Sequence, residues 1–293
     1  MSRNHMKEGF GSRLFDAINV IVMLLLVAAV LIPLIHVVSA SFSNPSDYVR
    51  HEGLLLKPLN PNLEAYKAVA RNKNIASGYM NTIFIVVVGT SLSLFLTVMA
   101  AYCLSRRDLM FRDPIMMLIV FSMYFNGGMI PFYLVVKGVG LNNSIWSLII
   151  PSAISTYNLI IMRTAMVSVP DSLEESARLD GANDWTILWR IMVPLVKPTL
   201  AVICLYYAVS NWNAWFNAML FMQDKKDYPL QLILREILIQ NDTVDMAAGA
   251  DDMLLSETIQ FATIVVATLP ILCIYPFIQR YFVKGVMIGA VKG

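Results

Sequence analysis

Side chains that could carry out catalysis are few in this chain and form no recognised pattern. The three histidines are scattered, and neither an HExxH metal-binding motif nor a G-x-x-x-x-G-K-[ST] phosphate-binding loop occurs. The three cysteines lie far apart inside apolar runs, which is typical of small buried side chains. We therefore expect no catalytic residue, metal site or cofactor in this chain, and we expect His36 to be a packing or interface residue.

A short charged segment, EESARLDGAN at residues 174–183, stands between two apolar runs. Ser172 followed by Glu175 fits a capping box, and Gly181 lies where a left-handed residue would end a helix. The pattern predicts a two-turn helix over residues 173–180, about 12 Å long, with Asn183 or Asp184 capping a second piece. A helix this short is marginal in water, so it is either a solvated loop helix or a docking element in which the small Ala177 permits close approach.

A polar solute could be recognised by the stretch YYAVSNWNAWFNAM, residues 206–219. Tyr207, Asn211 and Trp215 are spaced i, i+4 and i+8, so a continuous helix would place them on one face. Amides beside flat aromatic rings suit the hydroxyls and C–H faces of sugars, but amides also form hydrogen bonds between membrane helices. Both interpretations stay open. The residues assigned to a solute path are Tyr207, Asn211, Asn213, Trp215, Asn217, Asn126 and Tyr133, with Asn81 and Asn158 as weaker candidates.

The positions of these residues depend on apolar runs that are long enough to cross a bilayer. The chain has 293 residues, of which 57% are hydrophobic and 14% are charged, against about 25% charged in ordinary soluble domains. A net charge of +2 excludes a nucleic-acid footprint. About 20 apolar residues span a bilayer as a helix, so we predict an all-α integral membrane protein with six transmembrane helices, over residues 17–39, 79–104, 114–136, 144–166, 193–221 and 260–282.

The distribution of basic residues predicts the orientation. Most arginines and lysines in short connections lie on the same side as both termini, which we therefore place in the cytoplasm together with residues 174–183. The acidic loop 223–259 is then outside. The first apolar run is too long for a signal-peptide core and is expected to be a retained anchor. FNGG at residues 125–128, followed by Pro131, is expected to interrupt the third helix.

The predicted spans lack carboxylates at mid-depth, which argues against proton-coupled or sodium-coupled transport. A non-transporting scaffold or receptor with six spans is an alternative of a different class. An intramembrane enzyme is a weaker one, because no catalytic pair is visible within the spans.

The charged segment also resembles a known family motif. Glu175-Ser176-Ala177, three residues, Gly181, nine residues, Ile191, two residues and Pro194 resemble the EAA loop of ABC-importer permeases, E-A-A-x3-G-x9-I-x-L-P, with departures at Ser176 and Val193. The stretches MIPFYLVVKGVGLNNSIWSLIIP and YPFIQRYFVKGVMIGAVKG are similar to the carbohydrate, maltose-type branch of this family. FNGGMIPFYLVV is similar to a subset associated with acidic oligosaccharides, including alginate.

The resemblance implies a type I ABC-importer permease fold in the bacterial cytoplasmic membrane. Its expected domains are an N-terminal segment, first helix and outer loop (1–78), a five-helix core (79–282) and a cytoplasmic tail (283–293). Its expected partners are a second permease subunit, forming a heterodimer, two cytoplasmic ATPase subunits that bind ATP and Mg, and an extracytoplasmic solute-binding protein. The coupling helix that would contact the ATPase comprises Glu174, Glu175, Ser176, Ala177, Asp180 and Gly181, and the binding protein would meet Asp245, Asp251 and Asp252.

The function implied is the membrane pathway for an oligosaccharide, with uronates such as alginate as a candidate class. The absence of a basic cluster within the predicted spans counts against uronates. A non-sugar solute is the alternative within the family.

Overall fold

Helices form every regular element in the part of the chain that the structure describes. This computed structural model describes residues 10–239, 256–273 and 276. The chain divides into two compact units, Met1–Arg71 with Asn241–Val266, and Asn72–Gln240 with Ala267–Gly293. Each unit is described separately.

The first unit contains α1 (Phe10–Ser41), α2 (Pro45–Arg50) and α3 (Glu64–Arg71). Helix α1 is long and apolar enough to cross a membrane. Its apolar side chains are exposed over most of its length, as Leu24 (63% exposed) and Leu25 (65% exposed) illustrate, and buried residues begin only near its end, at Ser39 and Ala40. A helix that is apolar all round is stable only in a non-aqueous or buried setting, which agrees with the predicted anchor.

His36 is a packing residue, as expected. Its Nδ1 accepts a hydrogen bond from the backbone N–H of Leu55 at 2.9 Å. Its ring lies against Tyr48 and Phe261, with centroid distances of 6.2 and 5.7 Å. Burial, and then the negative charge of Glu257, raise the pKa of Tyr48 above its usual value.

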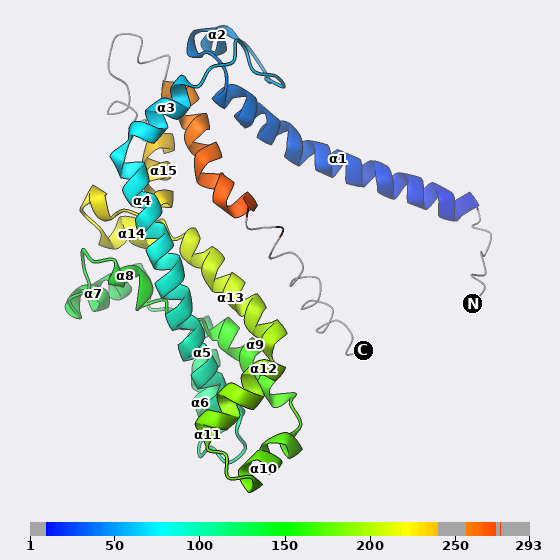
Figure 1. Ribbon diagram of the computed structural model, residues 1–293, viewed down its shortest axis with the longest axis vertical. Helices are drawn as coiled ribbons and strands as arrows, with labels where there is room; N and C mark the ends of the chain where they lie inside the picture. The colour runs from blue at the N-terminus through cyan, green and yellow to red at the C-terminus, as the bar shows by residue number, and fades with distance from the viewer. Residues whose placement is uncertain (1–9, 240–255, 274–275, 277–293) are drawn as a thin grey trace. The chain divides into compact units, whose positions relative to one another are not determined.

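One continuous helix of 33 residues, Lys73–Ser105, dominates the second unit. It comprises α4 (Lys73–Phe84), a π-helical turn (Ile85–Gly89) and α5 (Thr90–Ser105), and Figure 1 shows them as one rod. Gly89 permits a close approach here, because an added Cβ would lie 3.0 Å from Asn211 Nδ2. The second predicted span, residues 79–104, is confirmed, because it lies within this long apolar helix.

The third and fifth predicted spans are bent. Helices α6 (Arg112–Tyr124) and α7 (Met129–Gly138) meet at 117°, and the segments Asp184–Leu195 and Lys197–Trp212 meet at 86°. The interruption predicted at residues 125–128 is confirmed, and Gly128 adopts a φ of +89°, which a residue with a Cβ rarely does.

The prediction of one helix over residues 193–221 was wrong. The chain forms α12 (Val193–Leu195), α13 (Lys197–Trp212) and α14 (Phe216–Phe221). Pro198 lacks an N–H group, so the intrahelical ladder restarts there. Helix α13 ends at Trp212, where the Val209 carbonyl accepts hydrogen bonds from both the backbone N–H of Asn213, at 3.1 Å, and its side-chain Nδ2, at 2.9 Å.

The fourth predicted span, residues 144–166, is also not one helix. It forms α8 (Trp146–Ile149) and α9 (Thr156–Val167), separated at Pro151. The helix Ser256–Cys273 lies in the sixth predicted span, whose remaining residues fall outside the described ones. Among described residues, three helices are long and apolar enough to cross a membrane, or up to five if each bent pair counts as one span.

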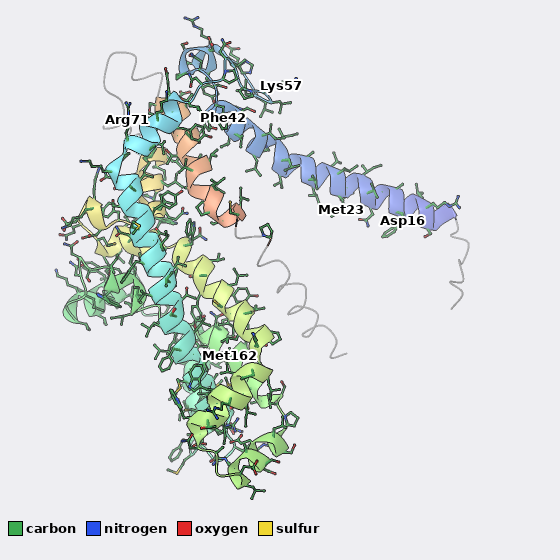
Figure 2. The ribbon with its side chains drawn as sticks, in the orientation of Figure 1. Asp16, Met23, Phe42, Lys57, Arg71 and Met162 are labelled. Atoms are coloured by element: carbon green, nitrogen blue, oxygen red, sulfur yellow. The ribbon has the colours of Figure 1, made fainter. Side chains whose placement is uncertain are left out.

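The main core of the second unit lies among α5, α9 and α13. Met162 of α9 is fully buried there, and Figure 2 labels it where these helices meet. Helix α15 (Leu230–Ile239) packs against α4 at Gly78. Figure 1 shows α10 (Asp171–Leu179) and α11 (Asp184–Ile187) at the opposite end of this unit from α15.

Candidate functional site

The charged segment forms α10, a helix that extends beyond the ends of α5 and α9. It begins at Asp171, two residues earlier than predicted, with Pro170 at the N-cap position. The predicted capping box was wrong, because Ser172 lies inside the first turn and no side chain caps the helix. Pro170 instead holds the N-cap position with an extended backbone, at a ψ of 130°, and Asp171 places a carboxylate at the positive end of the helix dipole.

The end of α10 agrees with the prediction. Gly181 has a φ of +81°, its N–H donates to the Arg178 carbonyl at 3.0 Å, and the N–H of Ala182 donates to the Ala177 carbonyl at 2.9 Å. These two bonds form a Schellman motif. Asn183 then caps α11, since its Oδ1 accepts a hydrogen bond from the N–H of Thr186 at 2.8 Å.

Replacing Gly181 with alanine should destabilise this turn by about 1–2 kcal/mol, because a Cβ is unfavourable at positive φ. Space is not the cause, as nothing lies within 4 Å of an added Cβ. Hydrogen exchange of the α10 amides should accelerate in Gly181→Ala and less in Gly181→Asn, because asparagine tolerates the left-handed region better. Equal protection in all three proteins would contradict this account.

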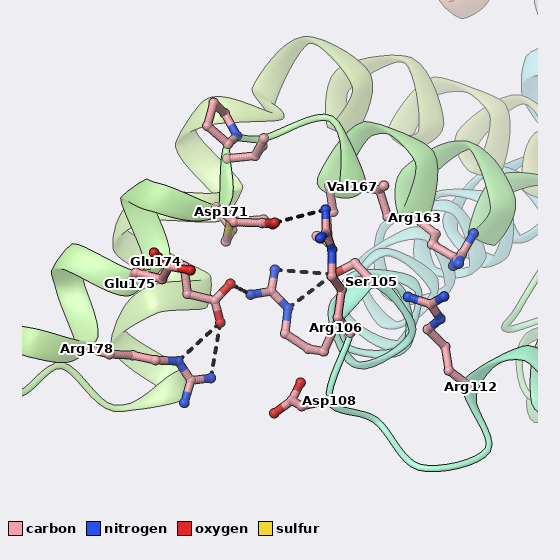
Figure 3. A pocket seen from close by; sticks show the side chains of 15 residues that line it. Ser105, Arg106, Asp108, Arg112, Arg163, Val167, Asp171, Glu174, Glu175 and Arg178 are labelled. Atoms are coloured by element: carbon pink, nitrogen blue, oxygen red, sulfur yellow. Dashed lines mark hydrogen bonds and ion pairs between the residues drawn. The ribbon is translucent and has the colours of Figure 1, made fainter.

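A chain of charged groups ties α10 to the rest of its own unit. Glu174 forms an ion pair with Arg106, which follows α5, and both side chains are only 16% exposed. Arg178 also pairs with Glu174, at 3.1 Å, and with Asp184 at 2.7 Å. The Arg106 guanidinium lies 4.5 Å from the ring centroid of Tyr102. Figure 3 shows the part of this chain that runs from Arg178 through Glu174 to Arg106.

The two faces of α10 differ. Ala177 is only 8% exposed and packs in the core of the unit, so its small size lets α10 approach its own chain rather than a partner, contrary to the expectation. The outer face presents Glu175, Ser176 and Asp180, which are exposed, and Leu179, which is 89% exposed. An exposed leucine beside unpaired polar groups is a surface suited to docking.

Some predicted path residues meet in a polar hollow between α9 and α13. This hollow has a volume of about 490 Å³ and is lined by Tyr207 and Asn211, together with Asn158, a weaker candidate. Asn211 Nδ2 also donates to Thr90 Oγ1 at 3.2 Å, so this amide both joins two helices and lines the hollow. The lining residues that the sequence did not single out are Ser152, Ile154, Ser155, Tyr157, Tyr206 and Ser210.

Tyr207 organises the break before α9. Its hydroxyl accepts a hydrogen bond from the N–H of Ser155 at 3.0 Å and shares another with Thr97 Oγ1 at 2.7 Å. Tyr207→Phe should lower the free energy of unfolding by about 1–3 kcal/mol, because the Ser155 N–H and the Thr97 hydroxyl lose their hydrogen-bond partner. The Tm of the purified protein should fall accordingly. Tyr157→Phe is the matched control, because the Tyr157 side chain is 56% exposed in the same hollow. Equal Tm values for the two variants would count against this role.

The other predicted path residues do not reach this hollow. Trp215 lies beyond the end of α13, so its expected place on one face with Tyr207 was wrong. Asn213 bonds its own helix, and Asn126 Oδ1 accepts a hydrogen bond from the Gly128 N–H at 2.9 Å. Tyr133 stacks on Phe221, Asn217 is half-buried in α14, and Asn81 Nδ2 donates to the carbonyls of Lys226 and Tyr228.

A basic side chain that the sequence did not single out covers Trp215. The Arg235 guanidinium of α15 lies 5.1 Å from the centre of the Trp215 ring. No carboxylate pairs with Arg235 among residues 10–239 and 256–273. The predicted contacts Asp245, Asp251 and Asp252 and the tail 283–293 lie outside the described residues.

Long apolar helices, two bent helix pairs and a charged helix beyond their ends define a multi-span integral membrane protein. The chain belongs to the family of binding-protein-dependent transport system inner membrane components, whose model matches residues 84–288. This membership confirms the family inferred from the sequence and favours a transport role over a non-transporting scaffold.

Individual relatives cover nearly the whole chain. The polygalacturonan/rhamnogalacturonan transport system permease protein YtcP of Bacillus subtilis (strain 168) is 43% identical over 287 residues, 96% of this chain and 99% of the relative. Protein LplC of the same organism is 40% identical over 285 residues, 96% of each chain. The crystal structure of a bacterial ABC transporter involved in the import of the acidic polysaccharide alginate contains a chain that is 34% identical, with a TM-score of 0.87, covering 94% of this chain and 99% of that one.

Proposed function

We propose that this chain is the permease subunit of an ATP-driven importer and forms the membrane path for an acidic oligosaccharide. The observation that carries the proposal is the polar hollow between α9 and α13, whose hydroxyls, amides and tyrosine rings match the groups of a sugar. The names of the relatives support the acidic class, because polygalacturonan and alginate are both uronate polymers.

Arg235 offers one basic group for a uronate carboxylate. An arginine can bind a carboxylate with two parallel N–H···O bonds while the neighbouring ring of Trp215 contacts the sugar face. The predicted spans contain no basic cluster, which counts against a uronate, but Arg235 in α15 supplies one basic group beside Trp215.

We propose that α10 is the coupling helix and that its outer face docks on a cytoplasmic ATPase. Glu175, Ser176 and Asp180 are exposed there and accessible to another subunit, whereas Glu174 is engaged within the chain. Glu174, Ala177 and Gly181 then hold the helix in place rather than contact the ATPase. The remaining partners in this proposal are a second, different permease subunit, a second ATPase copy and an extracytoplasmic binding protein that meets Asp245, Asp251 and Asp252.

The same proposal includes the orientation of the chain in the membrane and the assignment of ATP hydrolysis to separate subunits. Both termini lie in the cytoplasm, and the five-helix core 79–282 is flanked by segments 1–78 and 283–293. ATP and Mg are bound by the ATPase subunits, which supply the energy.

Transport of defined oligosaccharides by the reconstituted importer tests the substrate class. We expect uptake and solute-stimulated ATP hydrolysis with short galacturonate or alginate oligomers, and much less with neutral oligosaccharides of equal length. Arg235→Gln should weaken the response to acidic oligomers more than the response to neutral ones. Stimulation by an amino acid or a peptide, with none by sugars, would refute the proposal.

A further inference from the structure

A pocket of about 410 Å³ lies where the ends of α5 and α9 and the start of α6 meet, and Figure 3 shows it. Three of its arginines have carboxylate partners in the same pocket: Arg106 and Arg178 pair with Glu174, and Arg107 pairs with Asp171. The two remaining arginines, Arg112 and Arg163, do not pair with any carboxylate that lines the pocket.

These two arginines leave most of their donors unused. Arg163 is half-buried, and its Nε donates to the Leu104 carbonyl at 2.9 Å. Arg112 uses its Nε on the adjacent Asp113 at 2.9 Å, but that carboxylate is 77% exposed, so water screens the pair. Each guanidinium has five N–H donors, and the terminal amino groups of both lack a protein acceptor within residues 10–239 and 256–273.

The two guanidinium groups repel each other unless an anion lies between them. Figure 3 shows both side chains reaching into the same side of the pocket, while Asp108 lies on the side of Arg106. Glu175 also lines the pocket, on α10. The lining holds five arginines and four carboxylates, and Arg112 and Arg163 are the two arginines that have no carboxylate partner within it. The planar forks of two arginines suit the oxygens of a phosphate group.

The surface next to Arg112 indicates where that phosphate group comes from. Helix α6 starts at this residue and exposes Ile115 (37%), Met117 (70%) and Leu118 (66%), while Val167 at the end of α9 is 51% exposed. Charged residues at the ends of apolar helices mark the boundary between membrane and water. A soluble phosphate would not contact this apolar surface, whereas acyl chains would cover it.

We propose that Arg112 and Arg163 bind the phosphate group of an anionic phospholipid whose acyl chains lie along the exposed face of α6. This site is separate from the solute path, and of the residues on the outer face of α10 only Glu175 lines it.

Lipid retention by the intact importer tests this site. The complex is placed in nanodiscs of phosphatidylglycerol and phosphatidylcholine, released into mild detergent, and analysed by native mass spectrometry for bound phosphatidylglycerol. The double variant Arg112→Gln/Arg163→Gln should retain roughly tenfold less phosphatidylglycerol, a change of about 1.4 kcal/mol in binding. The matched control, Arg50→Gln/Arg71→Gln, removes the same charge from exposed positions that do not line the pocket and should retain the wild-type amount.

Three results would overturn the proposal. One is equal retention by the double variant and the control. Another is displacement of the lipid by excess inorganic phosphate, which would assign the site to a soluble anion. The third is loss of the ATPase subunit from the double variant with lipid retention unchanged, which would make the arginines a protein contact. Should the double variant fail to fold, Arg112→Gln alone, at a side chain 29% exposed, should still lose part of the bound lipid.

Discussion

Exchanging Arg106 for glutamate is expected to abolish coupled uptake, and adding Glu174→Arg to the same chain should restore part of it. The wild-type ion pair joins α10 to the end of α5, and both side chains are 16% exposed. In Arg106→Glu, two carboxylates would face each other at a nearly buried position. This should lower the stability of the contact between α10 and α5 by about 3–5 kcal/mol, the usual penalty for breaking a buried pair. Because α10 is a short helix, a loss of this size is enough to release it from α5.

The charge-reversed pair should recover only partly because of Arg178. Glu174 also accepts from this side chain, and an arginine at 174 would repel it. Arg178 keeps its second partner, Asp184, at 2.7 Å, so it can turn away from position 174. Partial recovery would distinguish a specific pair from a general need for charge.

The measurement is the ratio of solute imported to ATP hydrolysed in proteoliposomes. This ratio should fall at least about tenfold in Arg106→Glu, because a loss of 1.4 kcal/mol already gives that factor. Arg107→Glu is the control: its pair with Asp171 spans 3.0 Å, but the side chains are 84% and 59% exposed. Such exposed pairs contribute at most about 1 kcal/mol. A similar fall in both variants would show that the loop, and not the Arg106–Glu174 pair, is responsible.

Glu175→Lys should remove the ATPase subunit from the purified complex without unfolding the permease. Glu175 is exposed, and no hydrogen bond or ion pair joins its side chain to another of the described residues. Its replacement therefore costs the permease itself little, usually within about 0.5 kcal/mol for such a surface site. A charge reversal at a docking surface is far more costly, because like charges meet at the interface.

Co-purification through a tag on the permease measures this effect. The amount of ATPase recovered should fall roughly tenfold or more, while the Tm of the permease stays the same. Glu64→Lys makes the same charge change at an exposed site in α3 and should recover the wild-type amount. Normal recovery of the ATPase with Glu175→Lys would remove the support for docking through this face of α10.

Local signals predicted part of the fold reliably. The spans 17–39 and 79–104, the interruption at residues 125–128 and the turn at Gly181 all follow from composition or from a residue whose backbone preference is strong. The capping box failed because Pro170 sets the start of α10, and a proline and a serine two residues later both fit a helix N-terminus.

The spans 144–166 and 193–221 show the limit of hydropathy. Both runs are apolar enough to be read as single helices, and both contain prolines, at 151, 194 and 198. Whether a proline kinks a helix or ends it depends on what satisfies the freed backbone groups. The backbone N–H of Ser155 is satisfied by the hydroxyl of Tyr207, a residue 52 positions away in the sequence.

The amino-acid sequence by itself determined that this protein crosses a membrane, belongs to a permease family and carries a short charged helix between apolar runs, because hydropathy, proline, glycine and motif spacing act over a few residues. Only the tertiary structure decided which side chains of that helix face outward and which are engaged. It brought Arg106 to Glu174, gathered Tyr207, Asn211 and Asn158 around one hollow, and left Arg112 and Arg163 unpaired with the carboxylates that line their pocket. Ion pairing and burial depend on distances between segments remote in the chain, and those distances are fixed by helix packing.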